Sequence, residues 1–558
     1  MRTNRNSFCL LGAAFALLLT AHGLFAQTEK PVFEEWMVLV LDGKPCGFGS
    51  TITTEIDTPG GPQYRTVIVQ EFVVKRMDSN LKITETSKVT EDAEGGVLSF
   101  SESTSTFGSN MESSGVREGD DLVVSSRGQT QRYHIPRLDA LGPEKIRQMS
   151  LAVPLKPGQA FTFNTFEAEY PQAIAVEKGT IVDQETRDVR GTERKLWKMT
   201  SELSMMPGVS STMWIDDKGN DVEALTPIPG IGDLHEYVTD RAECMKEPEG
   251  VEIFKQSLIR PQIAITSPGE QGLAVYRLTL NDPGKKITLW DQDATQRIIT
   301  TGPGTCEVQI TAPHITANDA QWQLPHEDTP EVHSYLQSTA YLEVNSPEIQ
   351  ALAKKAVGDE KNPVKAAHLI EKFVRAYITQ KDLSIAFASA QETAKSHEGD
   401  CTEHAVLCAA LGRAVGLPTR CVLGLGYIPP GANDPALSNE DGGDTGIFGG
   451  HMWAEAWVGP NQWVTMDAAM HGFDVGHIAV TKTALDEINP LVDLQAPLLE
   501  LMDNLKIEVE KVVAKSDMPQ PESTPKPTAQ ISPASTESPA PIPKTTSSPP
   551  DSRHPSVD

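Results

Sequence analysis

A cysteine, a histidine and an aspartate stand out as residues that could act together in catalysis. Cys401 follows Gly399 and Asp400, His451 follows two glycines, and Asp467 closes the segment WVTMD. A thiol becomes a strong nucleophile when an imidazole takes its proton, and a carboxylate on the far side of the imidazole fixes its tautomer. We therefore predict a nucleophile, a base and an orienting group, in that order along the chain.

The residues after Cys401 predict a helix that begins at the cysteine. Apolar residues recur there at three- and four-residue spacing, Asp400 or Thr402 could cap the first turn, and Gly416 should stop the helix. A thiol at this position lies near unpaired backbone N–H groups and the positive end of the helix dipole. Both favour the thiolate, so the predicted helix would activate Cys401.

Strands are predicted to supply the other two residues. Thr419–Leu425 is rich in Val and Leu and indicates a buried strand. His451–Val458 alternates in character, the segment GPNQ can turn, and Trp463–Asp467 can return as the antiparallel partner. Because residues equally far from a hairpin turn are neighbours, His451 and Asp467 should lie near the same end.

The segments GDCTEHA, LGRAVGLPTRCV, HMWAEAWV and WVTMD resemble the bacterial transglutaminase-like superfamily. The resemblance covers roughly residues 345 to 480. It implies a papain-related fold in which Cys401 is the nucleophile, His451 the base and Asp467 the orienting residue. The two alanines that follow the aspartate depart from the Pro and Thr that the family often has there, which concerns the turn more than the triad.

Four other residues in this region have competing interpretations. Cys408 and Cys421 are expected in the core, because a cysteine in an apolar helix or strand packs as a small hydrophobic residue. His404 is a rival base, but it is fixed on the same helix as the thiol and poorly placed to reach it. Glu455 shares a face with the candidate base and could contact substrate or, as we favour, pair with an arginine.

The N-terminus is typical of a secretory signal peptide. Residues 1–26 carry two arginines, a short apolar stretch and a candidate cleavage position after Ala26. No later segment is long and apolar enough to be expected to cross a bilayer. We therefore expect an exported protein, periplasmic or extracellular.

Composition narrows the choice of partners. The 558 residues carry a formal net charge of −28, which disfavours nucleic acid and anionic membrane surfaces and leaves a protein or peptide substrate. Cysteine spacing suggests no metal site, and no cofactor is predicted. Disulfide bonds Cys46–Cys244 and Cys244–Cys306 are both conceivable, and the oligomeric state is left open.

Changes of periodicity predict a multidomain chain that is β-rich at first and α+β later. The expected parts are a signal peptide (1–26), a β-rich domain (27–248), a second β segment (249–343), a transglutaminase-like α+β domain (344–482), a C-terminal helical extension (483–515) and a disordered Pro/Ser/Thr-rich tail (516–558).

Several elements of these parts can be placed more closely. A short helix is expected at Gly142–Met149 and a loop at Pro227–Gly232. The second β segment could be a small sandwich or the end of the first domain. Its expected strands are Leu273–Leu280, Ile287–Trp290 and Cys306–Thr311.

Three further segments bear on the candidate site. Ser384–Ala390 resembles a segment that lines the cleft in this family. The acidic, Gly-rich loop Pro429–Gly450 could be a lid, and its carboxylates give a weaker indication of Ca²⁺ binding. Pro497–Lys515 is expected to form one amphipathic helix.

The predicted chemistry is attack of a thiolate on an amide carbonyl, followed by hydrolysis or transamidation. Two other classes stay open: an envelope binding or assembly protein with a vestigial triad, and a secreted structural scaffold whose thiols are all buried. Both predict that Cys401→Ala changes no function, whereas the enzyme hypothesis predicts complete loss with an unchanged fold.

Overall fold

The fold of the protein is given by a computed structural model, which describes residues 29–518. Excluded within that range are residues 77–78, 107–108, 127–128, 207, 229–231, 253–257, 291–292, 313, 381–386, 433–443, 471, 487–497, 499–500 and 502–503. The predicted signal peptide, the tail from residue 519, residues 433–443 of the candidate lid and Ser384–Ala386 therefore lie outside the described residues. No helix in the described part of the chain is long and apolar enough to span a membrane.

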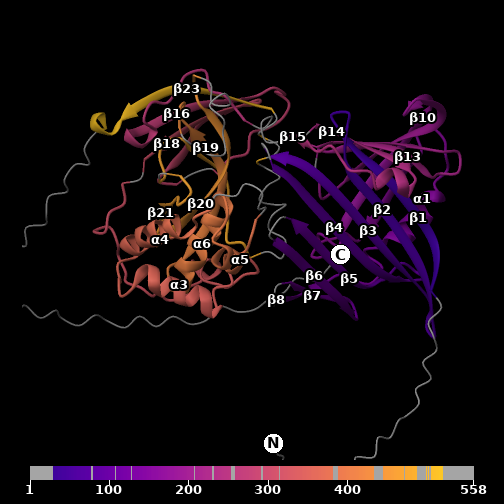
Figure 1. Cartoon of the computed structure of the whole chain (residues 1–558), viewed down its shortest axis with the longest axis horizontal. Coiled ribbons are helices and arrows are strands. Elements are labelled where there is room, and N and C mark those ends of the chain that lie inside the picture. The colour runs from indigo at the N-terminus through magenta and orange to yellow at the C-terminus, as the bar shows by residue number, and fades with distance from the viewer. Residues whose placement is uncertain are drawn as a thin grey trace, which may run out of the picture. The chain divides into compact units, whose positions relative to one another are not determined.

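The β-rich region confirmed by the structure is one large sheet of 15 strands (Figure 1). Its strand order is β8-β7-β6-β5-β4-β3-β2-β1-β14-β13-β12-β11-β10-β9, antiparallel throughout, and β15 pairs in parallel with β3. The strands are β1 (Glu29–Leu41), β2 (Lys44–Thr58), β3 (Gly61–Arg76), β4 (Ser79–Asp92), β5 (Val97–Thr106), β6 (Ser109–Glu118), β7 (Asp121–Ser126), β8 (Gln129–His134), β9 (Ala160–Thr165), β10 (Ala175–Val189), β11 (Thr192–Leu203), β12 (Ser210–Ile215), β13 (Asp221–Ile228), β14 (Gly232–Thr239) and β15 (Val251–Glu252).

Short turns join most of these strands. Asp42 and Gly43 between β1 and β2 both have positive φ, of 51° and 74°, as a tight hairpin turn requires. The expected helix is confirmed as α1 (Pro143–Leu151), and a second short helix, α2 (Arg241–Cys244), follows β14. The predicted loop at Pro227–Gly232 was placed too early, because ladder pairing with β14 carries β13 to Ile228.

The second β segment is part of a four-stranded sheet of order β17-β18-β16-β23. Its members are β16 (Gln271–Leu280), β17 (Gln296–Gly302), β18 (Thr305–Thr311) and β23 (Leu505–Ala514), with short 3₁₀ turns η2 (Pro268–Glu270), η3 (His333–Tyr335) and η4 (Lys515–Asp517) nearby in sequence. Two predictions are wrong here: Ile287–Trp290 is not a strand, and the end of the expected Pro497–Lys515 helix is β23. Alternation of Leu505, Ile507 and Val509 toward the core explains the strand.

The α+β part combines α3 (Pro347–Val357), α4 (Pro363–Tyr377), α5 (Ala390–Ser396) and α6 (Cys401–Ala414) with a second four-stranded antiparallel sheet. That sheet has the order β21-β20-β19-β22, with β19 (Thr419–Ile428), β20 (Ile447–Gly459), β21 (Gln462–Met466) and β22 (His477–Thr483). Figure 1 shows α6 among the other helices, and it packs against both β19 and β20.

One apolar core joins the α+β part to the sheet that contains β23. It includes Leu278 of β16, Ile507 of β23, Leu411 of α6 and Leu425 of β19. Neither of the expected arrangements for the second β segment is therefore found. These strands complete the domain that holds the candidate site.

Candidate active site

Cys401 is the first residue of α6, as the sequence predicts. Asp400 caps the helix, its side chain accepting a hydrogen bond from the backbone N–H of Thr402 at 2.9 Å. Cys401 is partly exposed, whereas the other five cysteines in the described part of the chain are buried. The protein therefore presents one accessible thiol at a helix N-terminus, among those six cysteines.

Glu403 locks the start of this helix from inside. It is fully buried and accepts hydrogen bonds from the backbone N–H groups of Asp400, at 2.9 Å, and Ala388, at 2.7 Å. Burial, and then the charge of Asp400, raises the pKa of Glu403 to about 8. Gly399 leaves room for this side chain, since its φ is +152° and a Cβ there would lie 2.3 Å from the Glu403 Cβ. Sequence reasoning gave Glu403 no role.

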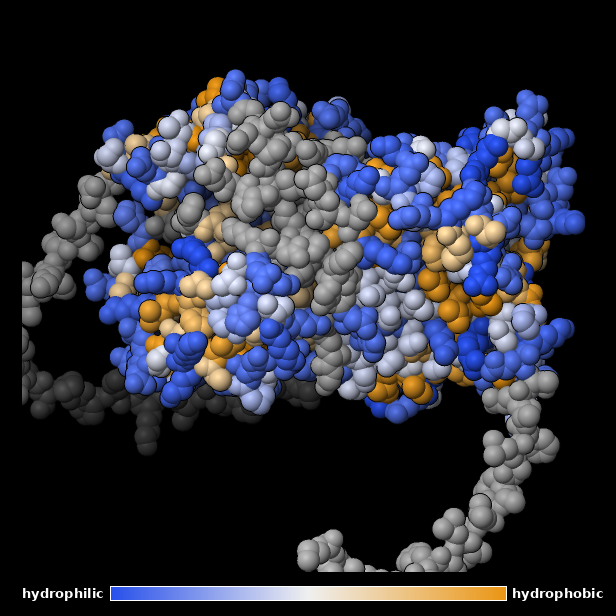
Figure 2. Space-filling view, in the orientation of Figure 1, coloured by the Kyte–Doolittle hydropathy of each residue, from blue (hydrophilic) through white to orange (hydrophobic). Residues whose placement is uncertain are grey.

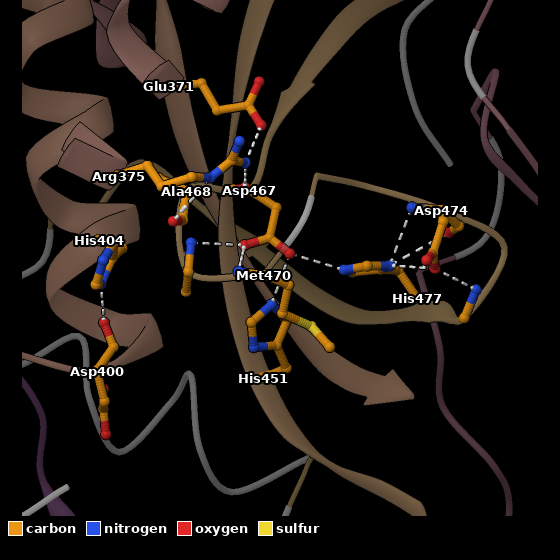
Figure 3. Close-up of polar contacts among 12 residues, drawn as sticks. Glu371, Arg375, Asp400, His404, His451, Asp467, Ala468, Met470, Asp474 and His477 are labelled. Atoms are coloured by element: carbon orange, nitrogen blue, oxygen red, sulfur yellow. Dashed lines mark hydrogen bonds and ion pairs between the residues drawn. The ribbon is translucent and has the colours of Figure 1, made fainter. Parts of the chain in front are cut away.

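The hairpin β20–β21 brings His451 and Asp467 together, which confirms their predicted placement. His451 lies on β20 and Asp467 directly follows β21. The His451 Nε2 and the Asp467 Oδ2 are 3.0 Å apart, and both side chains are buried (Figure 3). The first turn of α6, marked in Figure 3 by Asp400 and His404, belongs to the helix that packs against β20.

A second histidine, His477 at the start of β22, contacts the same carboxylate oxygen. Its Nε2 lies 3.0 Å from the Asp467 Oδ2, and its Nδ1 lies 3.2 Å from the Asp474 Oδ1 (Figure 3). The other carboxylate oxygen of Asp467 accepts the backbone N–H groups of Ala469 and Met470, at 3.0 and 3.1 Å. Four polar hydrogens thus converge on one buried carboxylate.

These contacts determine the charges in the cluster. Burial alone would raise the pKa of Asp467, but the positive charge and hydrogen bonds of His451 and His477 hold it well below the usual range. Burial alone would lower the pKa of His477, but hydrogen bonds to Asp467 and Asp474 raise it to about 9. At neutral pH Asp467 is therefore ionised and His477 is an imidazolium.

Sequence reasoning missed His477. It belongs to no motif, and its partner is reached only because β22 pairs with β19. Gly426 faces His477 in the β19–β22 register, but the space it leaves concerns the other histidine, His451. A Cβ at Gly426 would lie 2.9 Å from the Cβ and Cγ of His451, so the glycine leaves space that the imidazole fills.

Arg375 of α4 holds the chain segment that carries the carboxylate. Its guanidinium donates to the backbone carbonyl of Asp467 at 2.7 Å and to that of Ala468 at 3.4 Å, and it pairs with Glu371 (Figure 3). The two alanines after Asp467 depart from the residues that the family often has there, but the turn is still anchored through its backbone.

The competing interpretations are also resolved by contacts. Cys408 and Cys421 are buried, as predicted. His404 is buried too, with its Nδ1 2.6 Å from the Asp400 carbonyl oxygen, which places it inside the helix packing. Glu455 pairs with Arg420, as favoured, and also with Lys482. Cys46, Cys244 and Cys306 form no disulfide bond among the described residues.

His451, Asp467 and His477 are also side chains of types that bind transition metals. Their nearest ligand atoms all lie within 4.8 Å of one another. Each of those atoms already takes part in a hydrogen bond between these groups, and the carboxylate is fully buried. A metal ion would have to replace these bonds, so the arrangement fits a hydrogen-bonded relay better than a metal centre.

Gly426→Ala is expected to displace the imidazole of His451 and to lower any activity of the site roughly 10²-fold, since a shift of about 1 Å can cost that much. Gly449→Ala, on the facing strand, is the matched control, because a Cβ there would come only within 3.3 Å of a leucine side chain. Equal activity of the two variants would contradict the prediction. Circular dichroism would verify that both fold.

The raised pKa of His477 predicts a pH-dependent share of stability. Because the pKa is about 9 in the folded chain and about 6.5 when unfolded, this share is complete below pH 6.5 and is lost as pH rises through 9. It should amount to about 3 kcal/mol. Urea unfolding of wild type and His477→Gln would show a stability difference that shrinks from pH 6 to pH 9.5; a difference independent of pH would refute the assignment.

Comparisons with known proteins give a family for the α+β part alone. Residues 350–468 match the model of the transglutaminase-like superfamily. No curated protein matches the chain. His477 lies beyond the matched segment.

Two solved structures are similar to parts of the chain. One is a proposed cysteine protease from Cytophaga hutchinsonii, 16% identical, covering 44% of this chain and 86% of that one, with a TM-score of 0.26. The other is a beta-barrel-like protein of a domain of unknown function from Brucella abortus, 14% identical, covering 37% of this chain and 95% of that one, with a TM-score of 0.27.

Proposed function

Because residues 350–468 form a transglutaminase-like superfamily domain, we propose that the protein is a thiol enzyme that acts on amide bonds of proteins or peptides through an acyl-enzyme at Cys401. The observation that carries this proposal is the hydrogen bond between the Nε2 of His451 and Asp467. It leaves the Nδ1 as the nitrogen available to a thiol. The partly exposed thiol at the start of α6, the helix packed on the histidine's strand, supports the same assignment.

The proposed reaction has two halves. The thiolate of Cys401 attacks the carbonyl carbon, and the C–N bond breaks as His451 gives its proton to the departing amine, leaving a thioester. Water or a second amine then attacks the thioester, His451 accepts the proton of the attacking group, and the thiol is released. Water gives hydrolysis and a lysine amine gives a crosslink.

Asp467 orients His451 in this scheme, and His477 and Arg375 act as positioning residues. The imidazolium of His477 holds the carboxylate that faces the base, and Arg375 holds its backbone. We further propose, from the predicted signal peptide at residues 1–26, that the enzyme acts outside the cytoplasm. N-terminal sequencing of the mature protein would test this.

Iodoacetamide labelling across pH, followed by peptide mapping, tests the activated thiol. We expect Cys401 to be alkylated rapidly well below pH 8, because a base removes its proton, and the five buried cysteines to be spared. His451→Ala should slow the reaction. Labelling of Cys401 no faster than an ordinary thiol, in a folded protein, would sink the proposal and leave the envelope binding or assembly role.

The two possible outcomes of the second half are separated by mass spectrometry. A glutamine-containing peptide incubated with the enzyme and a primary amine should gain the mass of the amine, less ammonia, if transamidation occurs. Deamidation or backbone cleavage indicates hydrolysis. Cys401→Ala should give none of these products.

A further inference from the structure

The N-terminal sheet encloses a cavity of about 510 Å³, far in sequence from the candidate active site. Its walls come from β1 to β4 on one side and β9 to β13 on the other, with α1 between them. Since β14 separates these two groups of strands in the sheet order and both groups line one space, the sheet must curl around that space. A cavity of this size suits a small-molecule ligand.

Much of the cavity wall is apolar and aromatic. Phe33, Phe161, Phe163 and Phe166 line it, together with aliphatic and methionine side chains. Figure 2 shows orange apolar atoms among blue ones on the surface over the N-terminal sheet, near the positions of β1 and α1 in Figure 1. An apolar ligand group would therefore find a surface to pack against.

The charged groups of the wall are unbalanced. Glu35, Glu167, Glu177 and Asp221 line the cavity, and Arg147 is the one basic lining residue in the described part of the chain. Arg147 is already occupied: its guanidinium donates to both carboxylate oxygens of Glu144, at 2.7 and 2.8 Å, and lies over the Phe33 ring. It is thus a poor counter-charge for the four acids.

The four acids differ in the contacts that their side chains make with the described part of the chain. Glu167 accepts a hydrogen bond from Thr165 and Glu177 accepts one from Ser201. For the side chains of Glu35 and Asp221, no hydrogen bond or ion pair is found among residues 29–518 as far as the structure describes them. Burial, and then the charges of Asp221 and Glu236, raises the pKa of Glu35 to about 7, against a smaller opposing effect of the Arg147 charge. Burial, and then the charge of Glu177, raises the pKa of Asp221 to about 6.

We propose that this cavity binds a small amphipathic amine, whose ammonium group pairs with Glu35 and Asp221 and whose apolar body packs against the phenylalanines. A cation supplies the counter-charge that the wall lacks, and an aromatic wall tolerates it through cation–π contacts. A neutral apolar ligand would leave the carboxyl groups unpaired, and an anion would be repelled. The inference concerns the N-terminal sheet and does not depend on the proposed function.

Calorimetric titration of the full chain carrying Cys401→Ala, which excludes turnover, provides the test. Three probes of one shape are compared: 4-phenylbutylamine, 4-phenylbutanol and 4-phenylbutyrate. We expect the amine to bind at least about ten-fold more tightly than the alcohol, because a hydrogen-bonded charge pair forms, and the carboxylate not to bind. Equal binding of amine and alcohol, or no binding of the amine, would overturn the proposal.

Variants locate the amine in the cavity. Glu35→Gln and Asp221→Asn keep the shape of the wall and remove the charge, so each should weaken amine binding at least about ten-fold. Glu34→Gln and Asp57→Asn are the same substitutions at exposed positions of the same sheet that do not line the cavity, and they should leave binding unchanged. Full affinity in both cavity variants would place the amine elsewhere and reject the assignment.

Discussion

Asp467→Asn is expected to lower the rate of the Cys401 reaction by about 10⁴-fold, the scale seen when the orienting aspartate of a hydrolase triad is replaced in this way. The substitution preserves shape and removes charge. The remaining oxygen can still accept the backbone N–H groups of Ala469 and Met470. The fold should therefore survive while the chemistry fails.

The loss follows from the tautomer of His451. The oxygen of the asparagine would accept the backbone N–H groups of the turn, so its NH₂ group would point at the Nε2 of His451. That nitrogen must then accept a hydrogen bond. The proton of a neutral imidazole moves to Nδ1, the nitrogen needed to take the proton of the thiol. In the native protein His477 donates to the Asp467 Oδ2, so in the variant it would also face an N–H donor.

The measurement is the alkylation rate of Cys401 against pH, and turnover once a substrate is identified. Asp474→Asn is the matched control, because Asp474 contacts His477 and not His451 in the described part of the chain. We expect it to remain within about ten-fold of wild type, the cost of an outer partner. An Asp467→Asn protein with the native pH profile would remove the aspartate from the mechanism.

Glu455→Gln is expected to cost about 3–5 kcal/mol of unfolding free energy, the range for breaking a buried ion pair. Glu455 lies four residues after His451 on β20. It accepts hydrogen bonds from Arg420 at 2.8 Å and Lys482 at 2.9 Å, and Lys482 also pairs with Asp293. Removing the central carboxylate leaves two cations and one anion with side chains at most 10% exposed.

Urea unfolding at pH 7 would measure this cost. Glu29→Gln, which breaks the exposed pair with Arg65, should change stability by less than about 1 kcal/mol. In the double variant Glu455→Gln with Arg420→Gln, the charges that remain, on Lys482 and Asp293, balance each other. This variant should therefore lose less stability than the sum of the losses in the two single variants. Strict additivity would show that the charges are not coupled.

The local half of the candidate site was predictable from sequence. Cys401 begins α6 because Asp400 caps it, and His451 meets Asp467 because one hairpin turn sets their register. Both relations depend on residues close in the chain, for which periodicity and capping are informative.

The rest of the site and of the fold depends on pairing between strands that are distant in sequence. His477 reaches Asp467 because β22 pairs with β19, a choice that no pattern in either strand specifies. An amphipathic helix was expected at Pro497–Lys515, but β23 alternates and pairs with β16, more than 200 residues earlier. Ile287–Trp290 has the composition of a strand, yet these residues do not form one in the structure.

The pairing of β16 with β23 has a consequence for how the protein is made. The strand that completes the domain is synthesised last, after α6 and the β20–β21 hairpin, while its partner leaves the ribosome long before. Until residue 514 is available, Leu278 and its neighbours on β16 lack the apolar cover that Ile507 provides. Formation of such a long-range contact is slow. In a nascent chain Cys401 would therefore belong to a domain that is not yet completely folded. Assembly of the site would thus be delayed until β23 has been synthesised.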